Sequence, residues 1–228
     1  MKYGEIIKAL QYSDLSSHGI FADELDAQDK EKLLYCTNQA LTDIYTKYPL
    51  LQKELVVIQK SWISHYVLDK KYAFTAEPKD PNWYIFDSKY EPYTGDLLKI
   101  ISVTDEIGDY YALNSMGYCK VANTPAPNVL EIPNPTDTNA LFVTYRANHP
   151  VLVDEQSDIF IPSNWLPCLY ALVAHKIYAG GTAPEHVAKS QEMLQKYELF
   201  CSQQREYGMS NEDVFFTSCV NFNNGGWM

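Results

Sequence analysis

The apolar residues of this chain change their spacing twice along the sequence, and this change constrains the fold more than any other feature. In residues 2–10 and 26–48 they recur every three or four positions, as on one face of a helix. From 54 to 147 they form short runs rich in β-branched and aromatic residues, separated by turn residues. Helical spacing returns at 163–180 and 182–208. The pattern predicts two helices, a β-rich region and two more helices.

Local signals support the helix boundaries. Asp26 can cap the second helix, and Pro49 forbids its continuation. Ser163 can cap the third helix, while Thr182 and Glu185 have capping-box spacing at the start of the fourth. The predicted apolar face of the fourth helix consists of Val187, Gln191, Leu194, Tyr197 and Cys201.

The β-rich region contains several candidate strands. They are residues 54–58, 62–68, 71–74, 97–103, 110–113, 118–122, 129–132 and 141–147. The last alternates most regularly, with Leu141, Val143 and Tyr145 on one face. Its other face carries Phe142, Thr144 and Arg146. We therefore expect a half-buried strand here.

These elements predict an α+β fold with a four-helix bundle built from both chain ends. Residues 1–50 and 154–208 are expected to form the bundle, and residues 51–153 a β-rich insertion domain between helices 2 and 3. Residues 209–228 are expected to be a C-terminal arm. The arm is polar, yet it contains the aromatic residues Phe215, Phe216, Phe222 and Trp227. Exposed aromatic residues suggest a binding surface, so we expect these four to contact a partner protein.

The composition excludes several classes of protein. With 46% hydrophobic and 21% charged residues, the chain is globular rather than disordered. No apolar run approaches the roughly 20 residues that span a bilayer, and no secretion signal opens the chain, so we expect no membrane contact and synthesis in the cytoplasm. A net charge of −11 argues against a phosphate-binding groove. An acidic face would suit a channel through which DNA slides, although solubility explains the charge equally well.

The sequence contains no strong catalytic or metal-binding motif. Its five cysteines include no C-x-x-C pair, and its five histidines are spread singly. Residues 105–109 could offer calcium ligands, but a hairpin turn explains them more simply. Cys119 or Cys168 with a distant histidine is too weak a signal for a nucleophile, and His175 is interpreted as a core or interface residue. We expect no enzyme activity, no metal site and no cofactor.

The 18 tyrosines leave two interpretations open. Tyr90, Tyr93 and the pair Trp83-Tyr84 could form a platform for a carbohydrate or a peptide. Tyrosine and tryptophan are also enriched where subunits meet, and this second interpretation requires no ligand.

The order of segments adds a family likeness. Residues 19–21 (Gly-Ile-Phe) and 23–25 (Asp-Glu-Leu) precede a helix that contains 38–44 (Asn-Gln-Ala-Leu-Thr-Asp-Ile). Later, 158–162 (Asp-Ile-Phe-Ile-Pro) leads through Trp165 into the third helix, which contains 171–178 (Ala-Leu-Val-Ala-His-Lys-Ile-Tyr). In this order the chain resembles the head-to-tail adaptor proteins of short-tailed bacteriophages, which include the tail tubular A-like proteins.

The resemblance implies a structural virion protein in the neck or tail of the particle. Such a subunit forms a homo-oligomeric ring, typically of twelve copies, between the portal protein and the tail or next ring protein. The genome passes through the ring without sequence-specific binding. The alternative is a carbohydrate- or protein-binding tail module, and a small hydrolase or transferase is a weaker one because the sequence shows no convergent polar site.

Overall fold

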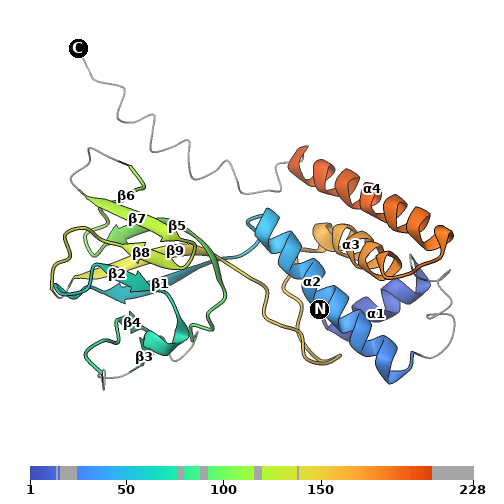
Figure 1. Ribbon diagram of the computed structural model, residues 1–228, viewed down its shortest axis with the longest axis horizontal. Helices are drawn as coiled ribbons and strands as arrows, with labels where there is room; N and C mark the ends of the chain where they lie inside the picture. The colour runs from blue at the N-terminus through green and yellow to red at the C-terminus, as the bar shows by residue number, and fades with distance from the viewer. Residues whose placement is uncertain are drawn as a thin grey trace, which may run out of the picture. The chain divides into compact units, whose positions relative to one another are not determined.

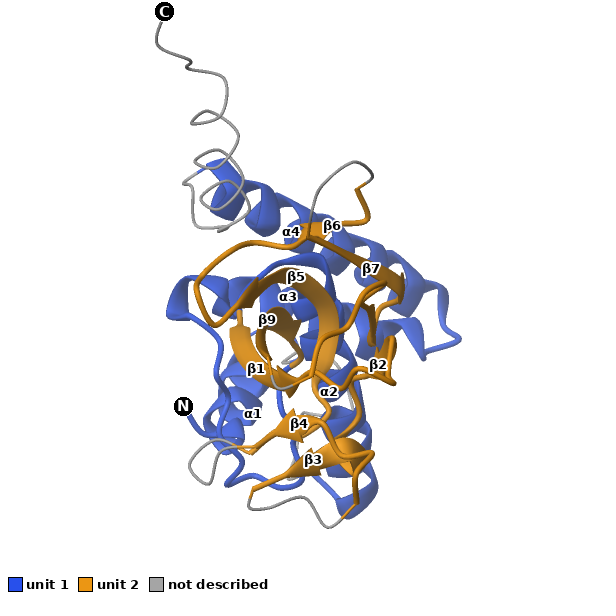
Figure 2. Cartoon of the chain, turned by 90° about the vertical axis from the view of Figure 1, so that its left-hand side faces the viewer, with its two compact units in different colours: residues 1–50, 149–228 blue, residues 51–148 orange. Residues whose placement is uncertain are grey.

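A computed structural model (Figure 1) describes residues 1–13, 15, 25–75, 80–87, 92–115, 120–137 and 139–206. The chain divides into two compact units, which are coloured separately in Figure 2. We call Met1–Leu50 together with His149–Met228 the helical unit, and Leu51–Asn148 the β unit.

In its described residues, the helical unit has four α-helices and a short 3-10 helix. They are α1 (Tyr3–Tyr12), α2 (Ala27–Lys47), η3 (Ser163–Trp165), α3 (Leu166–Ala179) and α4 (Pro184–Glu206). The predicted cap of α2 is confirmed, because the Asp26 carboxylate accepts a hydrogen bond of 2.7 Å from the backbone N–H of Asp29. The predicted cap at Ser163 is wrong, because η3 begins there and leads directly into α3.

The expected four-helix bundle from both chain ends is also wrong. The fold is α+β, with helices at both ends of the chain and the β-rich part between them. However, α2 and α4 both pack on α3, while the ten-residue α1 touches α3 only briefly (Figure 1). The physical reason lies in α3, whose buried residues surround much of its circumference: Cys168, Leu169, Ala171, Leu172, Val173, Ala174, Ile177 and Tyr178. A helix that is apolar on most sides packs at the centre of its unit, rather than as one of four equivalent helices of a bundle.

The face that α4 buries differs from the predicted one. Tyr197 and Cys201 are buried as expected, but Val187 is 49% exposed. Ser190 and Met193 are buried instead. The polar Ser190 can face α3 because its hydroxyl bonds to His175 across the helix pair. The buried face of α4 is therefore set by its contacts with α3 rather than by its own apolar pattern.

The described residues of the β unit form nine strands in two mixed sheets. They are β1 (Gln52–Ile58), β2 (His65–Val67), β3 (Ala73–Phe74), β4 (Ile85–Phe86), β5 (Leu97–Asp105), β6 (Ala112–Leu113), β7 (Val121–Ala126), β8 (Val129–Glu131) and β9 (Ala140–Ala147). A 3-10 helix, η2 (Lys70–Tyr72), precedes β3. One sheet has the order β3-β4-β1-β9-β5 and the other β2-β8-β7-β6. Only β3 with β4 and β6 with β7 pair in parallel among the described strands.

Both sheets contribute to one apolar core. In β9 every second residue is buried, so the predicted inward face of Leu141, Val143 and Tyr145 is confirmed. Figure 2 shows β9 between β1 and β5. The buried side chains of these three strands belong to the same core cluster. Tyr66 and Leu130 enter the same core from the second sheet. β1 and β9 bury alternate residues, so their remaining residues lie on the outer face of the five-stranded sheet.

Candidate functional site

The residues predicted to bind a partner lie outside the described part of the chain. They are Phe215, Phe216, Phe222 and Trp227. Their contact with a partner stays a prediction. The opening segment of the family likeness, residues 19–21, also lies outside the described residues, as do Tyr90 and Cys119.

The outer face of the five-stranded sheet presents an apolar row that crosses four strands. The pairing of β3, β4, β1 and β9 places its members side by side: Phe74, Phe86, Val56 and Phe142. The rings of Phe74 and Phe86 meet edge to face, with centroids 5.8 Å apart. Phe86 is 48% exposed, and the other three are half-buried. We call these four residues the aromatic row, and such a patch marks an interaction surface.

The sequence contained a signal for this row that its alternation pattern did not reveal. Residues 55–58 are Leu-Val-Val-Ile, so both faces of β1 are apolar. A strand that is solvated on one face normally alternates with polar residues. Phe142 likewise lies between two core residues of β9. The register of the sheet was needed to bring these residues together with β4, a strand that the sequence pattern missed.

A second exposed apolar surface lies in the helical unit, on the loop of residues 149–162 that precedes η3. The Asn38 side chain holds this loop by donating to the Leu152 carbonyl (3.0 Å) and accepting from its N–H (2.8 Å). Further backbone bonds join it to the start of α1, including Tyr3 N–H to the Ser157 carbonyl at 3.0 Å. Leu152 is buried, but Val151 and Val153 are 74% and 76% exposed. The loop is thus held in place while presenting apolar side chains outward.

Most of the tyrosines of the β unit that the structure describes serve its core. Tyr84 and Tyr93 are both 4% exposed, so they cannot belong to a surface platform. The Tyr84 hydroxyl bonds to the backbone of Val67 at 2.9 Å, and that of Tyr93 donates to the Leu68 carbonyl at 3.0 Å. Burial raises the pKa of both hydroxyls.

The acidic cluster at residues 105–109 forms a hairpin turn. The Asp105 carboxylate accepts the N–H groups of Ile107 and Asp109, and Gly108 adopts a φ of 89°. Lys120 Nζ lies 2.5 Å from the Asp105 carboxylate and 2.7 Å from that of Asp109. The Lys120 ammonium therefore occupies the position beside these carboxylates that a bound calcium ion would take. Hydrogen bonding to Lys120 lowers the pKa of Asp105.

The thiols of two described cysteines in the helical unit are buried beside tyrosine side chains. Cys168 and Cys201 are 0% and 2% exposed, between α3 and α4. Hydrogen bonding to Cys201, together with burial, raises the pKa of Cys168. Hydrogen bonds from Cys168 and from the hydroxyls of Tyr48 and Tyr197 lower the pKa of Cys201. Cys168 is thus a poor nucleophile, because its protonated form is favoured and solvent does not reach it.

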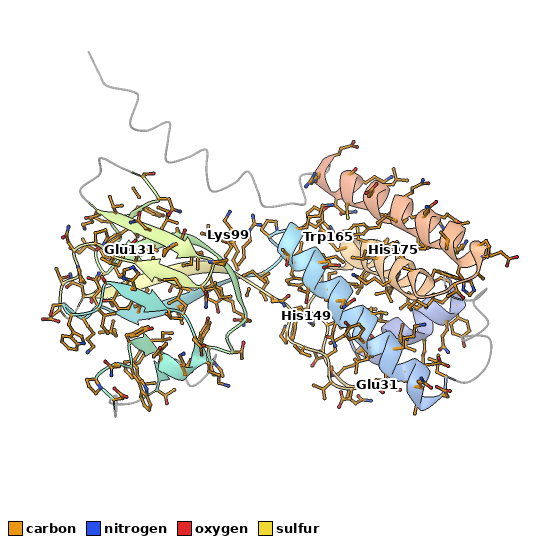
Figure 3. The ribbon with its side chains drawn as sticks, viewed as in Figure 1. Glu31, Lys99, Glu131, His149, Trp165 and His175 are labelled. Atoms are coloured by element: carbon orange, nitrogen blue, oxygen red, sulfur yellow. The ribbon has the colours of Figure 1, made fainter. Side chains whose placement is uncertain are left out.

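Two histidines labelled in Figure 3 have structural partners. His175 Nδ1 lies 2.9 Å from the Ser190 hydroxyl and 3.0 Å from the Ser190 carbonyl, which ties α3 to α4. His149 is 4% exposed. Its Nε2 accepts the N–H of Phe160 at 3.0 Å, so the proton resides on Nδ1, which faces the Pro150 carbonyl at 2.6 Å. His149 is therefore neutral in the folded chain.

This arrangement predicts a pH dependence of stability. Burial lowers the pKa of His149 below 6.5, so as pH falls the unfolded chain binds a proton before the folded chain does. The free energy of unfolding is therefore highest above pH 6.5 and decreases as the pH falls from 6.5 toward the lower pKa of the folded chain. The slope is at most about 1.4 kcal/mol per pH unit. We expect His149→Gln to make the free energy of urea unfolding less dependent on pH between pH 7 and 5. Equal slopes for His149→Gln and wild type would contradict the assignment.

Two surface hollows have polar linings that serve the fold. One of about 410 Å³ includes Asp69, whose carboxylate caps η2 through the Lys71 N–H. The other, of about 350 Å³, includes Asn38, which holds the 149–162 loop, and an ion pair of 2.6 Å between Asp43 and Lys176. These polar groups are already engaged, so neither hollow resembles a built ligand site.

Within the described residues, no group of three or more His, Cys, Asp or Glu side chains could hold a metal ion. Likewise, none of the helices given above combines the length and apolarity needed to cross a membrane. Compared with models of protein families and with curated proteins, the chain matches none.

Proposed function

We propose that the chain is a structural virion protein, a head-to-tail adaptor subunit that forms a ring between the portal and the tail of a short-tailed phage. The observation that carries the proposal is the aromatic row, because a subunit covered by neighbours needs apolar surface that a monomer would not expose. The segment order that resembles the adaptor family supplies the specific class. The genome would pass through the ring without sequence-specific binding.

A closed ring requires two different side faces on each subunit. The aromatic row offers one apolar face on the β unit. The loop of residues 149–162 offers another on the helical unit, through Val151 and Val153. Both surfaces are fixed by hydrogen bonds in their own unit, so association would require little reordering.

The experiment that tests this function is a mass measurement in solution, of the chain alone and mixed with a portal protein. We expect a ring, typically of twelve copies, on mixing. A chain that stays monomeric at micromolar concentration with the portal proteins of short-tailed phages would contradict the proposal. Deleting residues 209–228 tests the arm separately: a pull-down with unchanged portal binding would rule out Phe215, Phe216, Phe222 and Trp227 as its anchor.

Phe86→Asp is expected to reduce ring formation at least about tenfold, which corresponds to about 1.4 kcal/mol of association free energy. The substitution places a charge in the aromatic row, where burial by a neighbour would be costly. Ring yield is measured by light scattering after chromatography, and the fold is checked by circular dichroism. The control is Ile107→Asp at the tip of the hairpin, where the side chain is 86% exposed. Equal ring yields for both variants would exclude the aromatic row as the interface.

A further inference from the structure

The helices α3 and α4 form an antiparallel pair, and two hydrogen-bonded contacts fix how they align. Near the turn that joins the helices, the Ser190 hydroxyl lies 2.9 Å from His175 Nδ1. At the other end, the Asn164 side chain donates a hydrogen bond of 2.8 Å to the Gln204 side chain. Figure 1 shows the two helices side by side, and Figure 3 labels His175. Side chains on the facing sides of the helices, between these contacts, therefore lie opposite one another.

Two cysteines occupy this interface, one on each helix. Cys168 on α3 comes four residues after Asn164. Cys201 on α4 comes three residues before Gln204, so both cysteines lie about one helical turn from that contact. They are 0% and 2% exposed, and their thiols form a hydrogen bond with each other. The fold thus brings together two free thiols from distant parts of the sequence.

The two thiols differ in how readily they ionise. The hydrogen bond that Cys168 donates lowers the pKa of Cys201, and the hydroxyls of two tyrosines donate to the same thiol: Tyr48 and Tyr197. The positive charge of Lys47 acts in the same direction. Cys168 keeps its proton, because it donates to Cys201 and is buried. Cys201 is therefore the nucleophile of the pair, and Cys168 is the thiol that can supply a proton.

Cys201 lies close to the end of α4. It precedes Glu206, the last described residue, by five positions, and three of the residues between them are exposed: Ser202, Gln203 and Arg205. The last turns of a helix open at low free energy, because their backbone hydrogen bonds are few and exposed to solvent. A molecule as small as hydrogen peroxide can then reach the Cys201 sulfur while α3 stays folded.

We propose that Cys168 and Cys201 form a redox-sensitive pair, which hydrogen peroxide converts into a disulfide between α3 and α4. The Cys201 thiolate attacks one peroxide oxygen and becomes a sulfenic acid as the O–O bond breaks. The hydroxide that leaves takes up the proton that Cys201 had released. The Cys168 sulfur then attacks the sulfenic sulfur, and its proton leaves with the displaced hydroxide as water. Two thiols are oxidised to one disulfide, and one peroxide is reduced to two molecules of water.

The disulfide fixes the end of α4 against α3, the central helix of the unit. A cross-link removes the states in which α4 has separated from α3, so local opening at the end of α4 becomes rarer. Where thiol reductants are abundant, exchange with them returns the pair to two thiols. The reaction takes place within one helical unit and does not require ring formation.

The test is peptide mapping of the full-length chain after peroxide treatment under native conditions, with the remaining thiols alkylated before digestion. Trypsin, which cleaves after lysine and arginine, places Cys168 in peptide 147–176 and Cys201 in peptide 197–205. We expect these two peptides to be joined in most chains and to separate on reduction with dithiothreitol. Amide exchange at the end of α4 should be at least about tenfold slower in the oxidised chain, because the cross-link opposes opening.

Cys36 is the matched control thiol, because it is also buried, at 7% exposed, and burial raises its pKa. Cys36→Ser should leave the yield of joined peptides unchanged, whereas Cys201→Ser should abolish it and leave Cys168 as a free thiol. The wild-type measurement needs no variant, so it stands even if a substitution unfolds the chain.

Three results would overturn the proposal. The first is free thiols at both Cys168 and Cys201 under peroxide that fully oxidises free cysteine in the same buffer. The second is separate oxidation of the two cysteines to sulfinic or sulfonic acids without any joined peptides. The third is joined peptides that occur only in a covalent dimer, which would assign the disulfide to two copies of the chain.

Discussion

Replacing Trp165 with alanine is expected to lower the free energy of unfolding of the helical unit by about 3–5 kcal/mol. The Trp165 side chain is fully buried, and its ring lies 4.6 Å from that of Tyr48. Trp165 therefore joins the end of α2 to the start of α3, where η3 leads into the central helix. Removing the indole leaves a cavity that the surrounding helices cannot fill without moving.

Urea unfolding followed by circular dichroism measures this loss, and hydrogen exchange locates it. Trp62→Ala is the control: the side chain is 62% exposed, with Lys60 over its ring at 5.8 Å. We expect that control to change stability by less than about 0.5 kcal/mol. A similar loss in both variants would show that Trp165 is not a core residue.

Replacing Asp96 with alanine is expected to destabilise the β unit by about 2–3 kcal/mol. The Asp96 carboxylate, only 10% exposed, accepts hydrogen bonds of 3.0 Å from Lys53 Nζ and 3.1 Å from the Tyr145 hydroxyl. The substitution deprives a largely buried ammonium and a buried hydroxyl of this partner at once. Such groups are costly to bury without compensation.

The control for this prediction is Asp109→Ala, which removes an exposed carboxylate from Lys120. We expect little change there, because exposed ion pairs contribute little to stability. Hydrogen exchange should show lost protection in β1, β5 and β9 for the Asp96 variant. Equal midpoints of urea unfolding for the two variants would contradict the role given to Asp96.

Local chemistry explains which structural predictions succeeded. The cap at Asp26 and the alternation of β9 depend on residues close in sequence, so they could be predicted without tertiary contacts. β4 was missed because Ile85 and Phe86 form only a two-residue strand, whose identity depends on its pairing with β1. The bundle was wrong because counting four helices does not reveal which of them is central.

The candidate surfaces divide in the same way. The aromatic residues of the arm could be identified from sequence, and their contacts stay a prediction. The aromatic row could not be identified from sequence, because Phe74, Phe86 and Phe142 come from separate strands that only the sheet register brings together.

The sequence by itself determined the order of the four helices and of the β-rich region between them, the cap of α2, the inward face of β9 and the acidic, globular character of the chain. These properties depend on local propensity and periodicity. Tertiary structure alone decided that α3 is central, that the outer face of a sheet is apolar, and that Lys120 fills the acidic hairpin. The physical reason is that each depends on residues far apart in the chain, whose proximity follows from packing and strand register rather than from any local pattern.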